Sequence, residues 1–218
     1  MTDQPVDYLS LSVRDFVAAT AARTPTPGGG SVAGVVGALG AALGHMALGF
    51  TRGKKKYAAH EPYYEHLAPR LAKFQTMFEL LVVDDVAAYR LYQDSTHLAD
   101  GPEKEQAVQL ALSAATNVPR ETAKTATALL EDLREFAGKC SPFLITDLMA
   151  AAALAAVVAR LSDYNVRVNV PQLADRQVAA GDSTRRAAHD IRDASAGDLR
   201  RAGELLTAIE EASKGILP

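Results

Sequence analysis

The chain has 218 residues, a formal net charge of −3 and one cysteine, Cys140. A chain of this length can bury a substantial core, and we treat residues 1–218 as one domain. The near-neutral charge gives no support for a nucleic-acid partner. A single cysteine excludes an internal disulfide framework and fits a reducing, cytoplasmic location, and the polar N-terminus does not resemble a signal peptide.

Helical signals dominate, because no segment alternates polar and apolar residues over more than a few positions. A first helix is predicted over residues 12–23, where Ser12 begins a sequence similar to a capping box. We therefore expect an all-α fold, an antiparallel multi-helix bundle with two buried helices rich in alanine and glycine.

The segment after this helix, Thr24–Ser31, reads T-P-T-P-G-G-G-S. Its two X-Pro pairs favour extended backbone, and Gly28, Gly29 and Gly30 allow another group to approach closely. Ser31 is a favourable N-cap for the apolar run that follows. The segment predicts a backbone cradle for an anion or an electron-rich ring edge at a helix N-terminus, with a plain interhelix turn as the alternative.

The second predicted helix covers residues 31–51, and the stretch 30–50 contains no Lys, Arg, Asp or Glu. The stretch is long enough to span a membrane. It is mostly Ala and Gly, however, and includes His45, so we interpret it as a buried helix and expect no membrane partner.

Four cations follow this helix, and Tyr57 lies beside them. They form either a solvated surface or a clamp for a polycarboxylate. The cations are Arg52, Lys54, Lys55 and Lys56.

The third predicted helix, residues 62–95, carries an apolar stripe with heptad spacing. A carboxylate in an apolar seam costs free energy unless it is paired with another group or takes part in binding or catalysis. Asp85 lies in the stripe, so we select it over its neighbour Asp84 as a catalytic candidate. A structural cap or ion pair is the alternative. The stripe consists of Leu67, Leu71, Phe74, Phe78, Leu81, Asp85, Ala88 and Tyr92.

Further helices are predicted over residues 102–138 and 146–169, and a last one ends near Lys214. A proline inside a helical pattern should kink or split the helix. Pro69 and Pro119 are therefore expected to kink or split the helices that contain them. Thr146 is expected to cap the helix over residues 146–169. Pro171 or Asp175 should open the C-terminal region, and Gly181 should break it.

Three polar residues lie in the helix predicted over residues 146–169, namely Asp147, Asn165 and Asn169. Asp147 and Asn165 share a face but lie about 27 Å apart along the axis at 1.5 Å per residue. Either one of them is structural, or they bind two ends of a long ligand, or different subunits contribute them. The two asparagines indicate either a binding task or an interhelix hydrogen-bond pair.

The T-P-T-P-G-G-G-S segment occurs together with G-K-K-K-Y at residues 53–57. This pair resembles the S-P-T-P-G-G-G-S and G-K-K-K-Y motifs of the cyclodeaminase/cyclohydrolase family of folate enzymes. Weaker matches follow at residues 85–89, 117–119, 146–147 and 165–169. The sequence departs from the family pattern before Asp147, where both asparagines of Gly-Asn-x-Asn are missing, and at Val83, where relatives often carry an acidic residue.

The resemblance implies a methenyltetrahydrofolate cyclohydrolase, which hydrolyses 5,10-methenyltetrahydrofolate to 10-formyltetrahydrofolate. The alternatives are a formiminotetrahydrofolate cyclodeaminase, which releases ammonia, and a catalytically silent folate-binding or scaffold protein. It also implies a homodimer with the site near the subunit interface. We expect no metal and no cofactor beyond the folate substrate.

Asp85 and Asp147 are the candidate catalytic residues, one for a proton shuttle and one for the donor edge of the pterin. The candidate substrate-binding residues are Gly28, Gly29, Gly30, Ser31, Lys54, Lys55, Lys56, Tyr57, Asn165 and Asn169.

Overall fold

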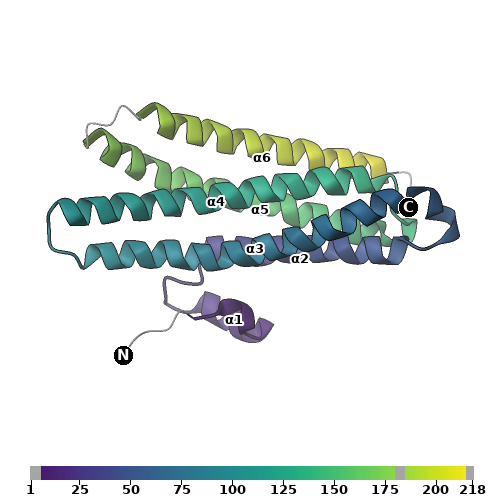
Figure 1. The fold of residues 1–218 in the computed structure, drawn as a ribbon, viewed down its shortest axis with the longest axis horizontal. Coiled ribbons are helices and arrows are strands. Elements are labelled where there is room, and N and C mark those ends of the chain that lie inside the picture. The colour runs from purple at the N-terminus through teal and green to yellow at the C-terminus, as the bar shows by residue number, and fades with distance from the viewer. Residues whose placement is uncertain (1–5, 180–184, 215–218) are drawn as a thin grey trace.

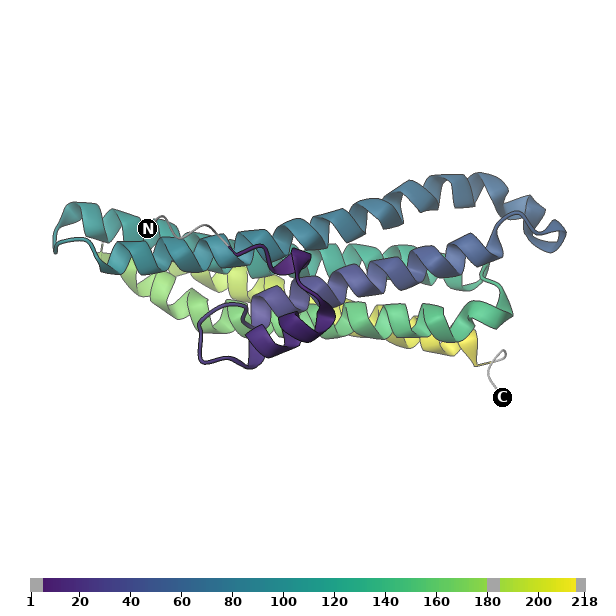
Figure 2. The ribbon, with the colours of Figure 1, turned by 90° about the horizontal axis from the view of Figure 1, so that it is seen from below.

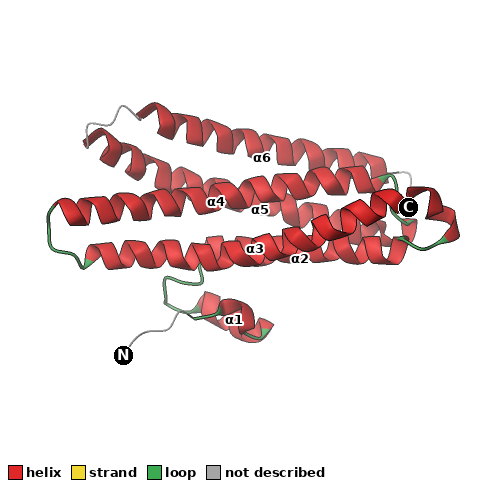
Figure 3. Ribbon diagram, in the orientation of Figure 1, coloured by secondary structure: helices red, strands yellow, loops and turns green. Residues whose placement is uncertain are grey.

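The computed structural model describes residues 6–179 and 185–214, and every regular element within them is helical (Figure 3). The all-α prediction is confirmed for this part of the chain. Its α-helices are α1 (Val13–Ala21), α2 (Gly29–Thr51), α3 (Glu61–Thr96), α4 (Pro102–Ala137), α5 (Ile145–Ala179) and α6 (Arg185–Ser213). Its 3₁₀ helices are η1 (Tyr8–Ser10), η2 (Lys55–His60) and η3 (Pro142–Leu144).

Helices α2, α3, α4 and α5 form a four-helix bundle in which α2 and α4 each pack against both α3 and α5. Helix α6 lies along α4 and α5 and covers that side of the bundle (Figure 1). Helix α1 stands apart, near the N-terminus of α2, and none of its residues is buried (Figures 1 and 2). Large side chains such as Tyr64, Phe78 and Phe136 fill the shared core.

Helix α2 begins two residues earlier than predicted, and Ser31 is not its N-cap. Gly28 is the N-cap and makes no side-chain cap hydrogen bond. Ser31 is instead the third residue of the helix, where its hydroxyl faces α3. The Ser31 hydroxyl therefore finds its acceptor outside the local sequence, on Asp85 of α3.

Helix α5 is longer than predicted, and Thr146 does not cap it. Because η3 leads directly into Ile145, Thr146 lies inside the helix. The helix continues through Pro171 and Asp175 to Ala179, so neither residue opens a new element. Packing overrides the local breaking tendency of the proline, since Val166, Val170 and Leu173 are buried against α4 and α6. The break expected at Gly181 lies outside the described residues.

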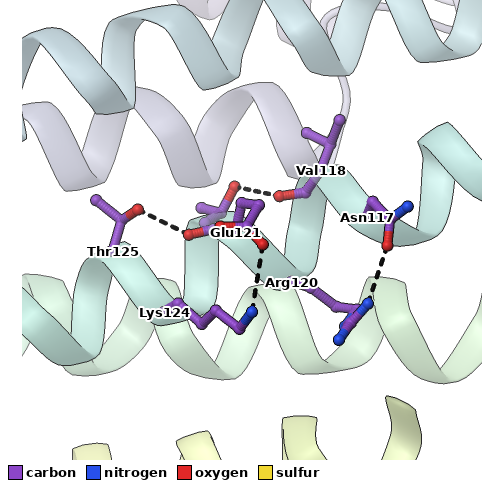
Figure 4. Close-up of polar contacts among 7 residues, drawn as sticks. Asn117, Val118, Arg120, Glu121, Lys124 and Thr125 are labelled. Atoms are coloured by element: carbon purple, nitrogen blue, oxygen red, sulfur yellow. Dashed lines mark hydrogen bonds and ion pairs between the residues drawn. The ribbon is translucent and has the colours of Figure 1, made fainter.

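Pro69 and Pro119 lie inside continuous helices, so neither splits its helix. A proline at position 119 cannot donate to the carbonyl four residues before it, which is that of Ala115. The side-chain Nδ2 of Asn169 donates to this carbonyl at 2.7 Å and fills the gap. Further along α4, Thr122 and Thr125 donate to backbone carbonyls of their own helix (Figure 4).

The glycines of α2 bring its backbone very close to its neighbours, as expected for a helix rich in small residues. A Cβ built on Gly34 would lie 2.5 Å from Val82 Cγ2, and one on Gly37 would lie 2.4 Å from Phe78 Cδ1. Such distances leave no room for a side chain. Phe78 and Val82 of α3 therefore pack directly against the backbone of α2.

Full burial of α2 is not reached within one chain, because its outer face is exposed. Leu39, Met46 and Phe50 on this face are 55%, 39% and 60% exposed. By length and composition, α2 and the span Pro142–Leu173 are each apolar enough to cross a membrane, and less than half of either apolar window is buried.

Candidate active site

The apolar seam of α3 forms as its heptad spacing predicts. Seven of its eight members point inward or sit at the helix contact, and only Tyr92, 39% exposed, lies at the surface. Asp84 is exposed, whereas Asp85 is half-buried against α2. The position of Asp85 follows from its register, since it occupies the place of an apolar residue in the seam.

Asp85 meets the glycine-rich N-terminus of α2. The Ser31 hydroxyl donates to Asp85 Oδ2 at 2.7 Å. A Cβ built on Gly30 would lie 2.0 Å from Asp85 Oδ1, so only glycine permits this approach. Gly30 thus makes room for a carboxylate of the protein. Asp85 also acts as an N-terminal acceptor for α2, a capping role that the sequence left as an alternative.

Burial raises the pKa of Asp85 above its ordinary value, and hydrogen bonding from the Ser31 hydroxyl and backbone opposes that shift without cancelling it. A carboxyl group with a raised pKa accepts and returns a proton more readily near neutral pH than an ordinary surface aspartate. The arrangement therefore suits a proton shuttle beside a helix N-terminus.

Asn165 of α5 reaches the same place from the other side of α2. A Cβ built on Gly29 would lie 4.0 Å from Asn165 Nδ2, and that amide also donates to the Leu161 carbonyl at 3.2 Å. The structure therefore brings together the T-P-G-G-G-S segment, Asp85 and Asn165. Gly28 and Gly29 have space around them, because a Cβ on either would meet no atom closer than 3.5 Å.

The lysine cluster lies at the opposite end of α2. Lys54, Lys55 and Lys56 are exposed, and the Lys56 ammonium sits 5.5 Å from the Tyr57 ring centre. Arg52 is not part of a free clamp, since its Nη2 lies 2.8 Å from Glu61 Oε1 in an ion pair.

Asp147 lies at the same end of the bundle as the lysine cluster. Both Asp147 and Lys54 act electrostatically on the Cys140 thiol, whose pKa is raised mainly by burial. The Ser141 N–H donates to Thr51 Oγ1 at 3.1 Å and ties the α4–α5 turn to the end of α2. The two candidate carboxylates, Asp85 and Asp147, therefore lie toward opposite ends of α2, a helix about 33 Å long at 1.5 Å per residue.

The side chain of Asn169 is used inside the bundle, where it donates to the Ala115 carbonyl at 2.7 Å. This is the interhelix hydrogen bond that the sequence left open as one alternative. Among the residues the structure describes, no group of three or more His, Cys, Asp or Glu side chains is placed to hold a metal ion.

No local pattern in the sequence indicates the role of Tyr8. Its hydroxyl donates to the Thr26 carbonyl at 2.9 Å and lies 3.0 Å from Thr26 Oγ1, which anchors η1 to the proline-rich segment. Tyr8 and Arg90 also line a cavity between η1 and α3. A lone tyrosine in a polar N-terminus carries no local signal for such a contact.

Comparisons with known proteins agree with this architecture. A family model described as formiminotransferase-cyclodeaminase matches residues 12–188. A crystal structure of formiminotetrahydrofolate cyclodeaminase from Thermotoga maritima matches with a TM-score of 0.77 at 26% identity, over 96% of both chains.

Two curated relatives show similar identity but different names. Methenyltetrahydrofolate cyclohydrolase of Methylorubrum extorquens is 30% identical over 173 residues, which cover 77% of this chain and 83% of that protein. Formimidoyltransferase-cyclodeaminase of Dictyostelium discoideum is 30% identical over 202 residues, covering 93% of this chain. The match covers only 37% of the Dictyostelium protein, so the chain spans little more than a third of it.

Proposed function

Because the chain belongs to the formiminotransferase-cyclodeaminase family, whose enzymes act on tetrahydrofolate derivatives, we propose that it hydrolyses 5,10-methenyltetrahydrofolate to 10-formyltetrahydrofolate. The observation that carries the proposal is the half-buried Asp85, held against Gly30 and Ser31 with a raised pKa. The Methylorubrum cyclohydrolase supports this choice, since the match covers most of both chains.

In the proposed reaction, water attacks the carbon that bridges N5 and N10 while Asp85 takes one proton from that water. The resulting tetrahedral carbon carries a hydroxyl group. Asp85 then returns the proton to N5 as the bond between N5 and the carbon breaks. The hydroxyl loses its proton to solvent and becomes the formyl oxygen, so one cation and one water yield one neutral product and one proton.

The charge of Asp85 has a second role in this proposal. The methenyl group of the substrate is part of a cationic amidinium-like centre, and a nearby carboxylate stabilises that charge. Burial strengthens the interaction, because the surroundings of a half-buried group screen charge less than water does.

We further propose that the active protein is a cytoplasmic homodimer in which the partner completes each site. Asp147, Lys54, Lys55, Lys56 and Tyr57 lie at the far end of α2 from Asp85. An isologous contact across the exposed face of α2, with the two helices antiparallel, would place the lysine end of one subunit beside the glycine end of the other. Support comes from that face itself, where Leu39, Met46 and Phe50 are exposed.

The first test mixes purified protein with 5,10-methenyltetrahydrofolate and follows the loss of its near-ultraviolet absorbance. We expect hydrolysis well above the buffer rate. Asp85→Asn should lower turnover by at least about tenfold, as expected when a proton shuttle is lost, and Asp84→Asn is the matched control because Asp84 is exposed one position away. Full activity of Asp85→Asn would remove Asp85 from the mechanism.

Two other outcomes identify the alternatives. Release of ammonia from formiminotetrahydrofolate would select the cyclodeaminase. The Thermotoga structure supports this alternative, because it is named a formiminotetrahydrofolate cyclodeaminase and matches over 96% of both chains. Tight folate binding by calorimetry without turnover would select a silent binding protein, an alternative that the missing asparagines before Asp147 keep in view.

A further inference from the structure

A cavity of about 480 Å³ lies between α3 and the N-terminal segment. Val82, Val86 and Arg90 of α3 line one side, and Val6 and Leu9 line the other. This volume is in the range of small-molecule sites, which combine apolar walls with a few polar groups that fix the orientation of the ligand. The cavity thus has the composition of a binding site.

Among the described residues that line this cavity, Arg90 is the only cation. It makes no ion pair with any residue that the structure describes. Asp7 also lines the cavity, but its carboxylate accepts from the Leu9 N–H at 3.1 Å as the N-cap of η1. A guanidinium beside apolar walls fits a flat apolar group that ends in a carboxylate, because two of its five N–H donors can match the two carboxylate oxygens.

Two residues connect this cavity to the candidate active site. Val82 lines the cavity and also packs against the α2 backbone at Gly34. Tyr8 lines the cavity and holds Thr26, which directly precedes Pro27 and the glycines. Arg90 lies five residues after Asp85 on α3, about 7.5 Å along the axis at 1.5 Å per residue.

We propose that this cavity binds the aminobenzoyl ring and the adjoining glutamate carboxylate of the folate, with Arg90 as the partner of the carboxylate. The inference rests on the proposed function, because it takes the reacting carbon of that folate to lie at Asp85. Within one chain the lysines at the far end of α2, about 33 Å away at 1.5 Å per residue, cannot reach the same carboxylate. They remain available for further glutamates of a polyglutamate tail bound across subunits.

The direct test is calorimetry with p-aminobenzoylglutamate, which carries the ring and the carboxylates but no pterin and no reacting carbon. We expect binding that Arg90→Met weakens by about tenfold or more, as for the loss of a hydrogen bond between charged groups. Arg90→Lys should recover part of the affinity. Arg134→Met is the control, since Arg134 is an exposed arginine in the last turn of α4.

A second variant tests the cavity without touching its charge. Ala87 is exposed and lines the cavity, so Ala87→Phe should fill part of the volume, leave the fold intact and weaken the same binding. Tetrahydrofolate should compete with p-aminobenzoylglutamate for the protein. Absence of binding, binding unaffected by both Arg90→Met and Ala87→Phe, or binding that tetrahydrofolate does not displace would each overturn the proposal.

The binding measurement separates this inference from the proposed function, because it needs no turnover. Binding of p-aminobenzoylglutamate that depends on Arg90, in a protein that does not hydrolyse methenyltetrahydrofolate, would support the cavity and reject the reaction. Hydrolysis with the same KM for monoglutamate substrate in wild type and Arg90→Met would support the reaction and reject the cavity as the binding site. We expect Arg90→Met to raise this KM and to leave kcat within about threefold, as for a contact made equally in the ground and transition states.

Discussion

The Ser31 hydroxyl donates to Asp85 Oδ2 at 2.7 Å across the contact between α2 and α3, although 54 positions separate the two residues in the chain. Through this bond the side chain of Ser31, the third residue of α2, contacts the carboxylate of Asp85 in the apolar seam of α3. Asp85 therefore accepts a hydrogen bond from the N-terminal turn of α2 and remains within reach of a ligand at the glycines. Mutations at the two residues can separate these roles.

Asp85→Asn should leave the protein at least as stable as wild type at pH 7. The pKa of Asp85 is raised in the folded state, so the folded protein binds this proton more tightly than the unfolded chain does. The charged carboxylate therefore costs stability above its folded pKa, and that cost disappears as pH falls below the unfolded value of 3.8. Urea unfolding from pH 3.5 to 7 measures the difference, and a loss of stability at pH 7 would show that Asp85 is chiefly a cap.

Ser31→Ala should shift the acidic limb of the pH–rate profile to higher pH. Hydrogen bonding from Ser31 lowers the pKa of Asp85, so its removal lets burial raise that pKa further. Less of the carboxylate is then ionised at a given acidic pH, and the rate falls. Ser95→Ala is the control, because it removes a buried hydroxyl that donates only to the Tyr92 carbonyl of its own helix. An unchanged profile would mean that Asp85 does not control the rate.

Gly30→Ala should reduce activity sharply, because the added methyl group overlaps the position of Asp85 Oδ1. The carboxylate or the helix must move to relieve this contact. Gly49→Ala in the same helix has no atom within 4 Å of the new Cβ and should stabilise the protein by about 0.5–1 kcal/mol through helix propensity. Turnover should therefore fall in Gly30→Ala and stay unchanged in Gly49→Ala, whose thermal unfolding temperature should rise, and equal behaviour of the two variants would contradict the close contact.

Asn169→Ala should destabilise the protein by about 1 kcal/mol, because it leaves the Ala115 carbonyl without its donor. Pro119 cannot replace that donor. Asn117→Ala, on the exposed face of α4, removes only a contact with Arg120 and should cost less (Figure 4). Chemical denaturation measures both effects. A large loss of folate affinity in Asn169→Ala without a change in stability would instead support the predicted substrate-binding role.

Replacing Lys55 and Lys56 by Gln should raise the KM for polyglutamylated folate more than for the monoglutamate. Both lysines are exposed, so their attraction for a tail is screened by salt over about 8 Å at physiological ionic strength, and the effect should shrink as salt rises. Steady-state kinetics at two salt concentrations test this. A pure loss of kcat would instead place a lysine at the reacting carbon.

The dimer proposal has its own measurement. Sedimentation should give a dimer at micromolar concentration, and Phe50→Glu on the exposed face of α2 should yield monomers with reduced activity. Monomers with full activity, or recovery of the protein only with membranes, would contradict a site completed by a partner subunit.

The sequence by itself determined that the fold is all-helical, and it singled out Asp85 as a candidate. Helix type follows from the 3.6-residue period, and a charged residue in an apolar stripe is visible without any knowledge of its neighbours. The same reasoning gave the ends of α4 within a residue, because Pro102 and Gly138 are local signals.

Only the tertiary structure decided what these residues meet. It placed Ser31 and Gly30 on Asp85, put Asp147 at the lysine end of α2, and carried α5 through Pro171. It also gave Asn169 a partner at the carbonyl freed by Pro119, and formed the cavity beside Arg90. Such contacts join residues that are distant in the chain, and they depend on how helices of similar pattern pack side by side, for which the local sequence carries no signal.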